Sequence, residues 1–145
     1  MEKKQYKVQI DAPREKVWDI LWDDKTYREW TTAFSPGSYA VTDWKTGSKT
    51  LFLGENGDGM VSRIAESRPA EFMSIEHLGE VRGRVEDTTS EKVRQWAGSL
   101  ENYTLRNSNG GTELVVDIDV PSDFVEMFDG MWPKAMANIK AIAER

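Results

Sequence analysis

The sequence has 145 residues, a length typical of a single domain, and we expect residues 1–145 to form one. It carries 25 Asp and Glu against 19 Lys and Arg, a formal net charge of −6. The basic surface that nucleic acids require is therefore missing, and binding to an anionic membrane surface is disfavoured. The absence of cysteine excludes disulfides, thiolate metal sites and cysteine nucleophiles.

The N-terminal segment does not resemble a targeting signal. Residues 1–11 are charged and are not followed by the apolar stretch of a signal peptide. No apolar run approaches the ~20 residues that a membrane helix needs. We therefore expect no membrane insertion, and we expect a cytoplasmic protein. Six Trp, six Met, five Phe and four Tyr supply large side chains for a core.

The first predicted elements are a strand and a helix separated by a short turn. Residues 6–10 alternate apolar and polar side chains, the period of a half-buried strand. Asp11 is expected to cap the following helix, with Pro13 in its first turn. Helical spacing predicts one apolar face, formed by Val17, Trp18, Leu21 and Trp22. We interpret Trp18 as a core residue that helps to close one end of the sheet.

A second short helix and a series of strands follow. The helix is predicted over residues 25–34 and ends at the Ser-Pro-Gly sequence 35–37. The strands are expected at residues 38–44, 49–55, 60–67, 71–81, 99–107 and 112–120. The Asn-Gly pair within residues 56–59 is the strongest hairpin signal. Residues 82–97 are polar and are expected to hold only a short helical turn around residues 91–94.

The C-terminal segment predicts a long amphipathic helix. From Phe124 to Ile142 the apolar residues recur every three or four positions, over about five turns. Asp123 and Glu126 are expected to form a capping box at its start. Pro133 is expected to kink or divide the helix. Strands joined by hairpins predict a meandering antiparallel sheet, and this helix is the one element long enough to cover its apolar face.

Several motifs resemble the SRPBCC superfamily, which includes the START domains, the polyketide cyclases and the birch-pollen allergen. They are "DAPREKVWDILWD" at residues 11–23, "YREW" at 27–30 and "DWKTGSK" at 43–49. The ending "MFDGMWPKAMANIKAIAE" at 127–144 is similar to the branch named for the activator of the heat-shock chaperone ATPase. The resemblance implies an α+β helix-grip fold. In that fold a bent antiparallel sheet of about six or seven strands wraps around the C-terminal helix, two short helices follow the first strand, and a cavity lies between sheet and helix.

The single histidine, His77, is the most interesting polar candidate. Alternation places Met73, Ile75 and His77 on one face of their strand. If that face points inward, His77 is either a ligand contact or general acid–base in the cavity, or a simply hydrogen-bonded strand residue. The charged strand residues Arg63, Glu76, Arg84 and Glu101 are expected on solvated faces unless paired inside.

No metal site, cofactor site or catalytic constellation is predicted. One histidine without cysteine offers no metal cluster, and neither a GxSxG elbow nor a phosphate loop occurs. The aromatic and Met residues form either a plain core or the lining of a cavity. The candidates for a lining are Trp30, Phe34, Tyr39, Phe52, Met60, Met73, Ile75, His77, Trp96, Tyr103, Phe124, Met127, Phe128, Met131 and Trp132.

Three functions follow from these observations and from the resemblance. The first is binding of a small hydrophobic or amphipathic molecule. The second is a partner domain for the heat-shock chaperone, and the third is an enzyme resembling the polyketide cyclases and aromatases. The oligomeric state, monomer or dimer, is left open.

Overall fold

The chain begins with strand β1 (Glu2–Ile10), which lies at one edge of an eight-stranded antiparallel sheet in the computed structural model of residues 1–145. The other elements follow as α1 (Arg14–Trp22), α2 (Asp24–Trp30), η1 (Thr31–Ala33), β2 (Tyr39–Val41), β3 (Lys49–Leu53), β4 (Gly59–Arg68), β5 (Phe72–Arg82), β6 (Val85–Asp87), α3 (Glu91–Arg94), β7 (Ser99–Ser108), β8 (Gly111–Val120), η2 (Ser122–Phe124) and α4 (Val125–Glu144). The predicted α+β helix-grip class is confirmed, and short β6 is the one strand that the sequence did not predict.

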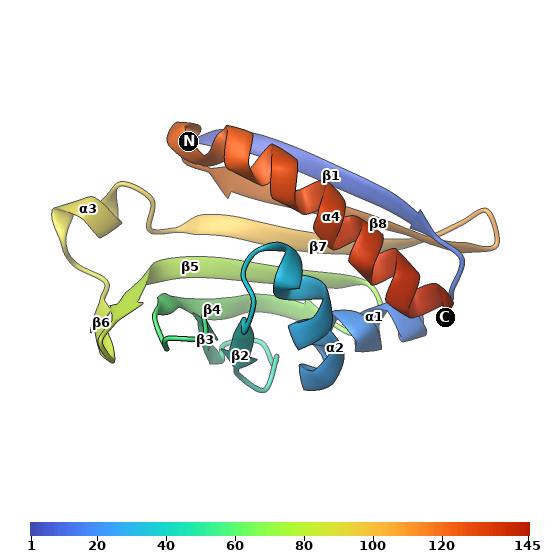
Figure 1. Ribbon diagram of the computed structural model, residues 1–145, viewed down its shortest axis with the longest axis horizontal. Helices are drawn as coiled ribbons and strands as arrows, with labels where there is room; N and C mark the ends of the chain where they lie inside the picture. The colour runs from blue at the N-terminus through green and yellow to red at the C-terminus, as the bar shows by residue number, and fades with distance from the viewer.

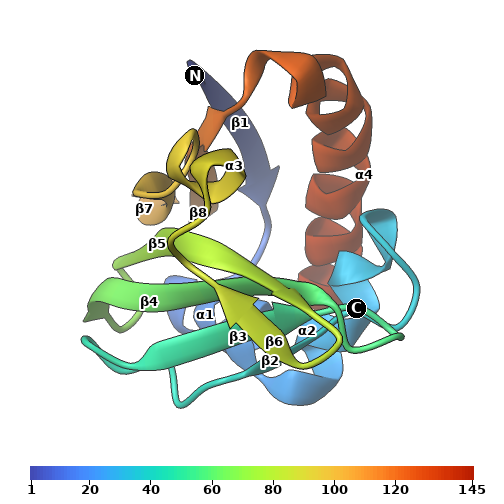
Figure 2. The same ribbon diagram turned by 90° about the vertical axis from the view of Figure 1, so that its left-hand side faces the viewer.

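The sheet wraps around one long helix. Its strand order is β1-β8-β7-β5-β4-β3-β2, with β6 paired to β5. Figure 1 shows α4 crossing the strands, with α1 and α2 at one end of the sheet. The perpendicular view in Figure 2 shows the bend that brings the two edges of the sheet toward the side on which α4 lies. The concave face therefore has a cover, which an antiparallel sheet with one apolar face requires.

Helix α4 buries a stripe that runs from Trp132 to its C-terminal end. The buried residues are Trp132, Ala135, Met136, Ile139, Ile142 and Ala143, at the spacing of one helix face. Of the two alternatives predicted at Pro133, a kink or a division, the division is wrong, because α4 is one continuous helix through this residue. Pro133 and Asp129, one turn earlier, are both exposed, so water can reach the carbonyl that loses its donor. No helix of the structure combines the length and apolar character needed to span a membrane.

Both predicted N-terminal caps are wrong. Helix α1 has Pro13 at its N-cap and no side-chain cap, while the Asp11 backbone N–H donates to Glu144 at 2.8 Å. Helix α4 has Phe124 at its N-cap, again without a side-chain hydrogen bond, because the turn η2 precedes it. Neither helix therefore has the capping side chain that its sequence motif predicts. The chain enters α4 through the turn η2, and before α1 Asp11 makes a long-range hydrogen bond to Glu144.

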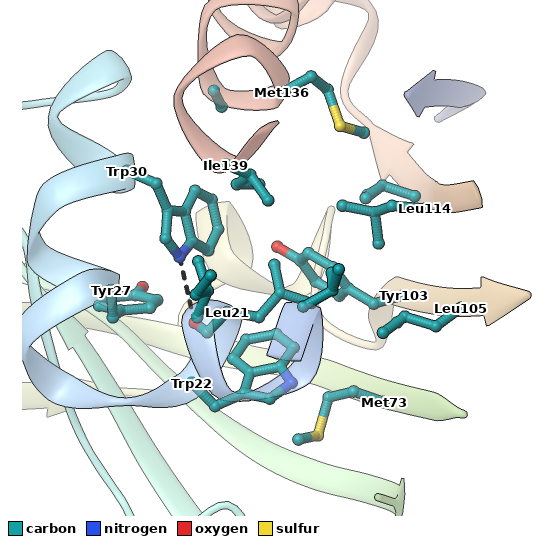
Figure 3. Close-up of a cluster of buried hydrophobic side chains, with 14 of the residues drawn as sticks. Leu21, Trp22, Tyr27, Trp30, Met73, Tyr103, Leu105, Leu114, Met136 and Ile139 are labelled. Atoms are coloured by element: carbon teal, nitrogen blue, oxygen red, sulfur yellow. Dashed lines mark hydrogen bonds between the residues drawn. The ribbon is translucent and has the colours of Figure 1, made fainter. Parts of the chain in front are cut away.

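The aromatic core at the end of α1 is built on Trp22, and the prediction for Trp18 is wrong. Trp22 is 6% exposed, and its ring lies 4.8 Å from Tyr103 and 4.6 Å from Trp44, between centroids. Trp18 is only partly buried and contacts Trp22 edge-on at 6.0 Å. Figure 3 shows Trp22 among the buried residues and the hydrogen bond from the Trp30 indole N–H to the Leu21 carbonyl, at 3.1 Å.

The two α1 tryptophans give a matched test of this packing. Trp22→Ala should lower the free energy of unfolding by about 3–5 kcal/mol, because it empties a large core site. Trp18→Ala should cost less than about 2 kcal/mol, since that side chain is only partly buried at the margin of the core. Urea unfolding of both variants measures the difference. Equal losses would show that α1 is rotated relative to the position described.

Candidate functional site

A cavity of about 570 Å³ opens between the concave face of the sheet, α2 and the first half of α4. Its volume falls in the range of ~300–1,000 Å³ that is typical of small-molecule sites. The helix contributes Phe128, Met131 and Trp132, all of which precede the closely packed second half of α4. The cavity therefore occupies the space between sheet and helix that the core does not fill.

Most of the residues predicted from the sequence as lining candidates border this cavity. They are Trp30, Phe34, Tyr39, Phe52, Met60, Ile75, His77, Tyr103, Phe128, Met131 and Trp132. They come from α2, β2–β5, β7, α4 and the loop that follows η1. The bend of the sheet brings these distant segments to one space.

Four predicted lining residues lie elsewhere. Met73 has no exposed surface and belongs to the core, where Figure 3 places it below Trp22. Trp96 follows the short helix α3 and is half-buried outside the cavity. Phe124 and Met127 are each 48% exposed, because they precede the part of α4 that packs on the sheet.

The sequence did not single out Trp22, Tyr27 or Glu101 as lining residues, although all three border the cavity. The position of Glu101 in the sequence does indicate that it faces inward. It stands two residues before Tyr103 and four before Leu105, both buried, and strand alternation places the three on one face. A charged residue on the inward face of a strand is therefore the pattern that identifies Glu101 as a lining candidate.

Six aromatic side chains form what we call the aromatic wall. They are Tyr27, Trp30, Phe34, Phe52, Tyr103 and Trp132. Successive ring centroids lie 6.1 Å apart for Tyr103–Trp132, 6.4 Å for Trp132–Trp30, 5.4 Å for Trp30–Tyr27 and 6.4 Å for Tyr27–Phe52. Phe34 packs on Trp132 at 5.0 Å. Each ring is thus held by at least one other, which favours a preformed surface.

A chain of polar side chains, here called the polar cluster, runs from the cavity lining, at Tyr103, Glu101 and His77, to the buried Ser62. Ser62 Oγ lies 2.7 Å from His77 Nδ1, and His77 Nε2 lies 3.0 Å from Glu101 Oε1. The Tyr103 hydroxyl donates to the second oxygen of Glu101. Sheet register explains the assembly, since Ser62 pairs with His77, and Glu101 lies beside it on β7 with Ile75 as its partner. A bulge between Val61 and Ser62 sets the first of these pairings.

The polar cluster has the residue types of a serine-based triad but not the geometry. Ser62 has no exposed surface, so its hydroxyl cannot reach a substrate. Both ring nitrogens of His77 are occupied, and one neutral tautomer satisfies them: Nε2–H donates to Glu101, and Nδ1 accepts from Ser62. The cluster therefore presents a fixed carboxylate and a phenol rather than a nucleophile. No group of three or more His, Asp and Glu side chains is placed to hold a metal ion.

The other charged residues singled out from the sequence lie outside the cavity. Arg63 and Glu76 form an ion pair at 2.7 Å on the opposite face of the sheet. Arg84 is exposed in the turn before β6. Of the charged residues weighed from the sequence, Glu101 is thus the one that reaches the interior.

Burial raises the pKa of Tyr27 and Tyr103 above the ordinary value for a phenol, and the Glu101 charge adds to both shifts. Tyr27 is 9% exposed and Tyr103 is 1% exposed, so the phenolate form would have little access to water. Both phenols stay protonated in the folded protein well into the alkaline range. Tyr103 therefore remains a donor to Glu101 at neutral pH.

Comparisons with known proteins identify the fold. No protein-family model matches the sequence, and neither does any curated protein. Among solved structures, the Aha1 dimer from Colwellia psychrerythraea superimposes with a TM-score of 0.76 at 16% identity, over 99% of this chain and 97% of that chain. Protein MLL2253 from Mesorhizobium loti has a TM-score of 0.72 at 16% identity, over 97% and 96%.

A third structure of the same fold is DynU16, a protein of the dynemicin biosynthetic locus. Its TM-score is 0.72 at 16% identity, and the alignment covers 97% of this chain but 46% of the longer one. At this level of identity the three comparisons show a shared fold and nothing about a shared ligand. They are consistent with the START-like architecture predicted from the sequence.

The buried tyrosines predict a specific alkaline instability. The folded protein keeps the Tyr27 proton, while the unfolded chain loses it above about pH 10. The contribution of this burial to stability is therefore complete below pH 10 and is lost as pH rises further. Tyr27→Phe should remove about 1.4 kcal/mol per pH unit from the alkaline slope of the unfolding free energy. Urea unfolding between pH 8 and 12 measures it, and parallel curves for the two proteins would contradict the burial of Tyr27.

Proposed function

We propose that residues 1–145 form one ligand-binding domain, which holds a small, largely apolar molecule with a polar end in the cavity. The observation that carries this proposal is the coincidence of the aromatic wall with the polar cluster in one space of about 570 Å³. Apolar walls with a few placed polar groups are the usual construction of small-molecule sites.

The packing of the wall supports a preformed site. Trp30 is fixed by its hydrogen bond to Leu21, and Trp132 stacks on Tyr6 at 5.7 Å. The Tyr6 hydroxyl in turn donates to Asp129 at 2.8 Å, which ties the first half of α4 to β1. A wall held in this way loses little conformational freedom on binding, and that favours affinity.

A matched pair of variants on α4 tests ligand binding. Fatty acids, alkylamines, sterols and aromatic polyketides are screened for a rise in melting temperature. A ligand at about 100 times its Kd adds about 2.7 kcal/mol to the stability of the folded state. Met131→Trp fills the cavity and should abolish the rise, whereas Met127→Trp, one turn away and exposed, should preserve it.

Two results would overturn the proposal. If no compound class raises the melting temperature of the wild type, the cavity is not a binding site for these molecules. An equal rise in wild type and Met131→Trp would place the bound molecule somewhere else on the protein.

A second candidate is a partner domain for the heat-shock chaperone. Its support is the fold shared with the Aha1 dimer and the exposure of Phe124 and Met127 at the start of α4. A pull-down with the chaperone, together with its ATPase rate, tests the idea. The wild type should bind and raise the rate, and Phe124→Ser with Met127→Ser should reduce both. Absence of binding by the wild type would remove this candidate.

An enzyme resembling the cyclases ranks third. Its support is the position of His77 on the cavity wall. Both imidazole nitrogens already have partners, however, so neither is free to accept a proton from a substrate. This occupancy is the reason for ranking catalysis below binding.

A further inference from the structure

Glu101 is a largely buried carboxylate without a cationic partner from Lys or Arg. Its side chain is 18% exposed, and the residue borders the cavity. Its partner on the neighbouring strand is His77, at hydrogen-bond distance, and none of the 19 Lys and Arg residues lies at ion-pair distance from it. Tyr103 and His77 supply two hydrogen bonds, while a carboxylate has about four acceptor positions. The protein leaves part of this acceptor capacity for another donor.

The other charged residues that border the cavity are also mostly acidic. Asp58 and Glu80 also border the cavity, and Arg82 is the one Lys or Arg residue among the lining residues. Glu80 is paired with Arg82 at 3.5 Å and with Lys92 at 3.6 Å, so its charge is already balanced. Asp58 and Glu101 are the lining carboxylates without a Lys or Arg partner. An anionic head group would be repelled here, and the repulsion is stronger in a cavity than in water.

The aromatic wall reaches the carboxylate. Tyr103 bonds directly to Glu101, and the next ring, Trp132, lies 6.1 Å from Tyr103. The faces of aromatic rings attract cations, and indole does so most strongly. A carboxylate bonded to a tyrosine, with a tryptophan as the next ring of the wall, is thus suited to a positive charge carried on an apolar body.

We infer that the polar cluster selects a cationic amine, whose ammonium group donates to Glu101 while its apolar part lies against the aromatic wall. This inference rests on the ligand-binding function proposed above and names the class of ligand. It goes beyond that function because a carboxylic acid of the same size would fill the cavity equally well and would be rejected at Glu101.

Three eight-carbon probes separate charge from shape: octylamine, 1-octanol and octanoate. Their Kd values are measured by calorimetry at pH 7. Octylamine should bind the wild type about tenfold or more tightly than octanoate, the ratio expected when one partner gains a charged hydrogen bond. Binding of 1-octanol should be weaker than that of octylamine.

Two charge-neutralising variants locate the preference. Glu101→Gln keeps the size of the side chain and should reduce the preference for octylamine to about twofold or less, since the charge contribution to affinity is then removed. Glu76→Gln removes the same charge from the outer face of the neighbouring strand β5 and should leave the preference intact. This control separates a local effect from the overall negative charge of the chain.

The possible results distinguish failure of this inference from failure of the proposed function. If octanoate or 1-octanol binds the wild type as tightly as octylamine, the inference is wrong although ligand binding stands. The inference is equally wrong if the preference survives in Glu101→Gln or disappears in Glu76→Gln. If none of the three probes binds the wild type, the inference is wrong, and the wider melting-temperature screen decides the proposed function by itself. The comparison of probes on the wild type holds even if Glu101→Gln does not fold.

Discussion

The contact of α4 with the concave face of the sheet determines the rest of the structure. The second half of the helix presents Ala135, Met136, Ile139, Ile142 and Ala143 to the core. The first half presents the larger Phe128, Met131 and Trp132, and these border the cavity. One helix thus supplies both the main seal of the core and one wall of the site. The cavity therefore lies beside the first half of α4, and the core lies under the second half.

Inside that cavity the main cost is the burial of Glu101. A carboxylate taken out of water is unfavourable unless its hydrogen bonds are replaced. The replacement comes from His77 and Tyr103, which lie on two neighbouring strands, and Ser62 on a third fixes the far side of the imidazole. The sheet register therefore matters as much as the residue types. A slip of β7 by one residue would turn Glu101 outward and leave His77 without its acceptor.

The sequence predicted which face of a strand or helix a residue occupies better than it predicted how deeply that residue is buried. Strand alternation placed Ile75 and His77 together, and the structure confirms that they share the concave face. Helical spacing gave the correct face of α4 but could not say where along it the core ends and the exposed residues Phe124 and Met127 begin. Trp18 failed for the same reason, because periodicity does not distinguish the margin of a core from its centre. These distinctions depend on the bend of the sheet, which is set by long-range pairing.

A shared fold at 16% identity does not indicate which ligand is bound. The chemistry of the site has to be inferred from the side chains of this chain. A helix-grip fold requires apolar residues on the concave face of its sheet, and Ile75, Tyr103 and Leu105 meet that requirement. Glu101 does not meet this requirement. An apolar residue at this position would pack without the cost of a buried charge. The proposed ligand gives a reason for a buried charge that packing alone does not require. Glu101 is therefore the residue from which the identity of the ligand is best approached.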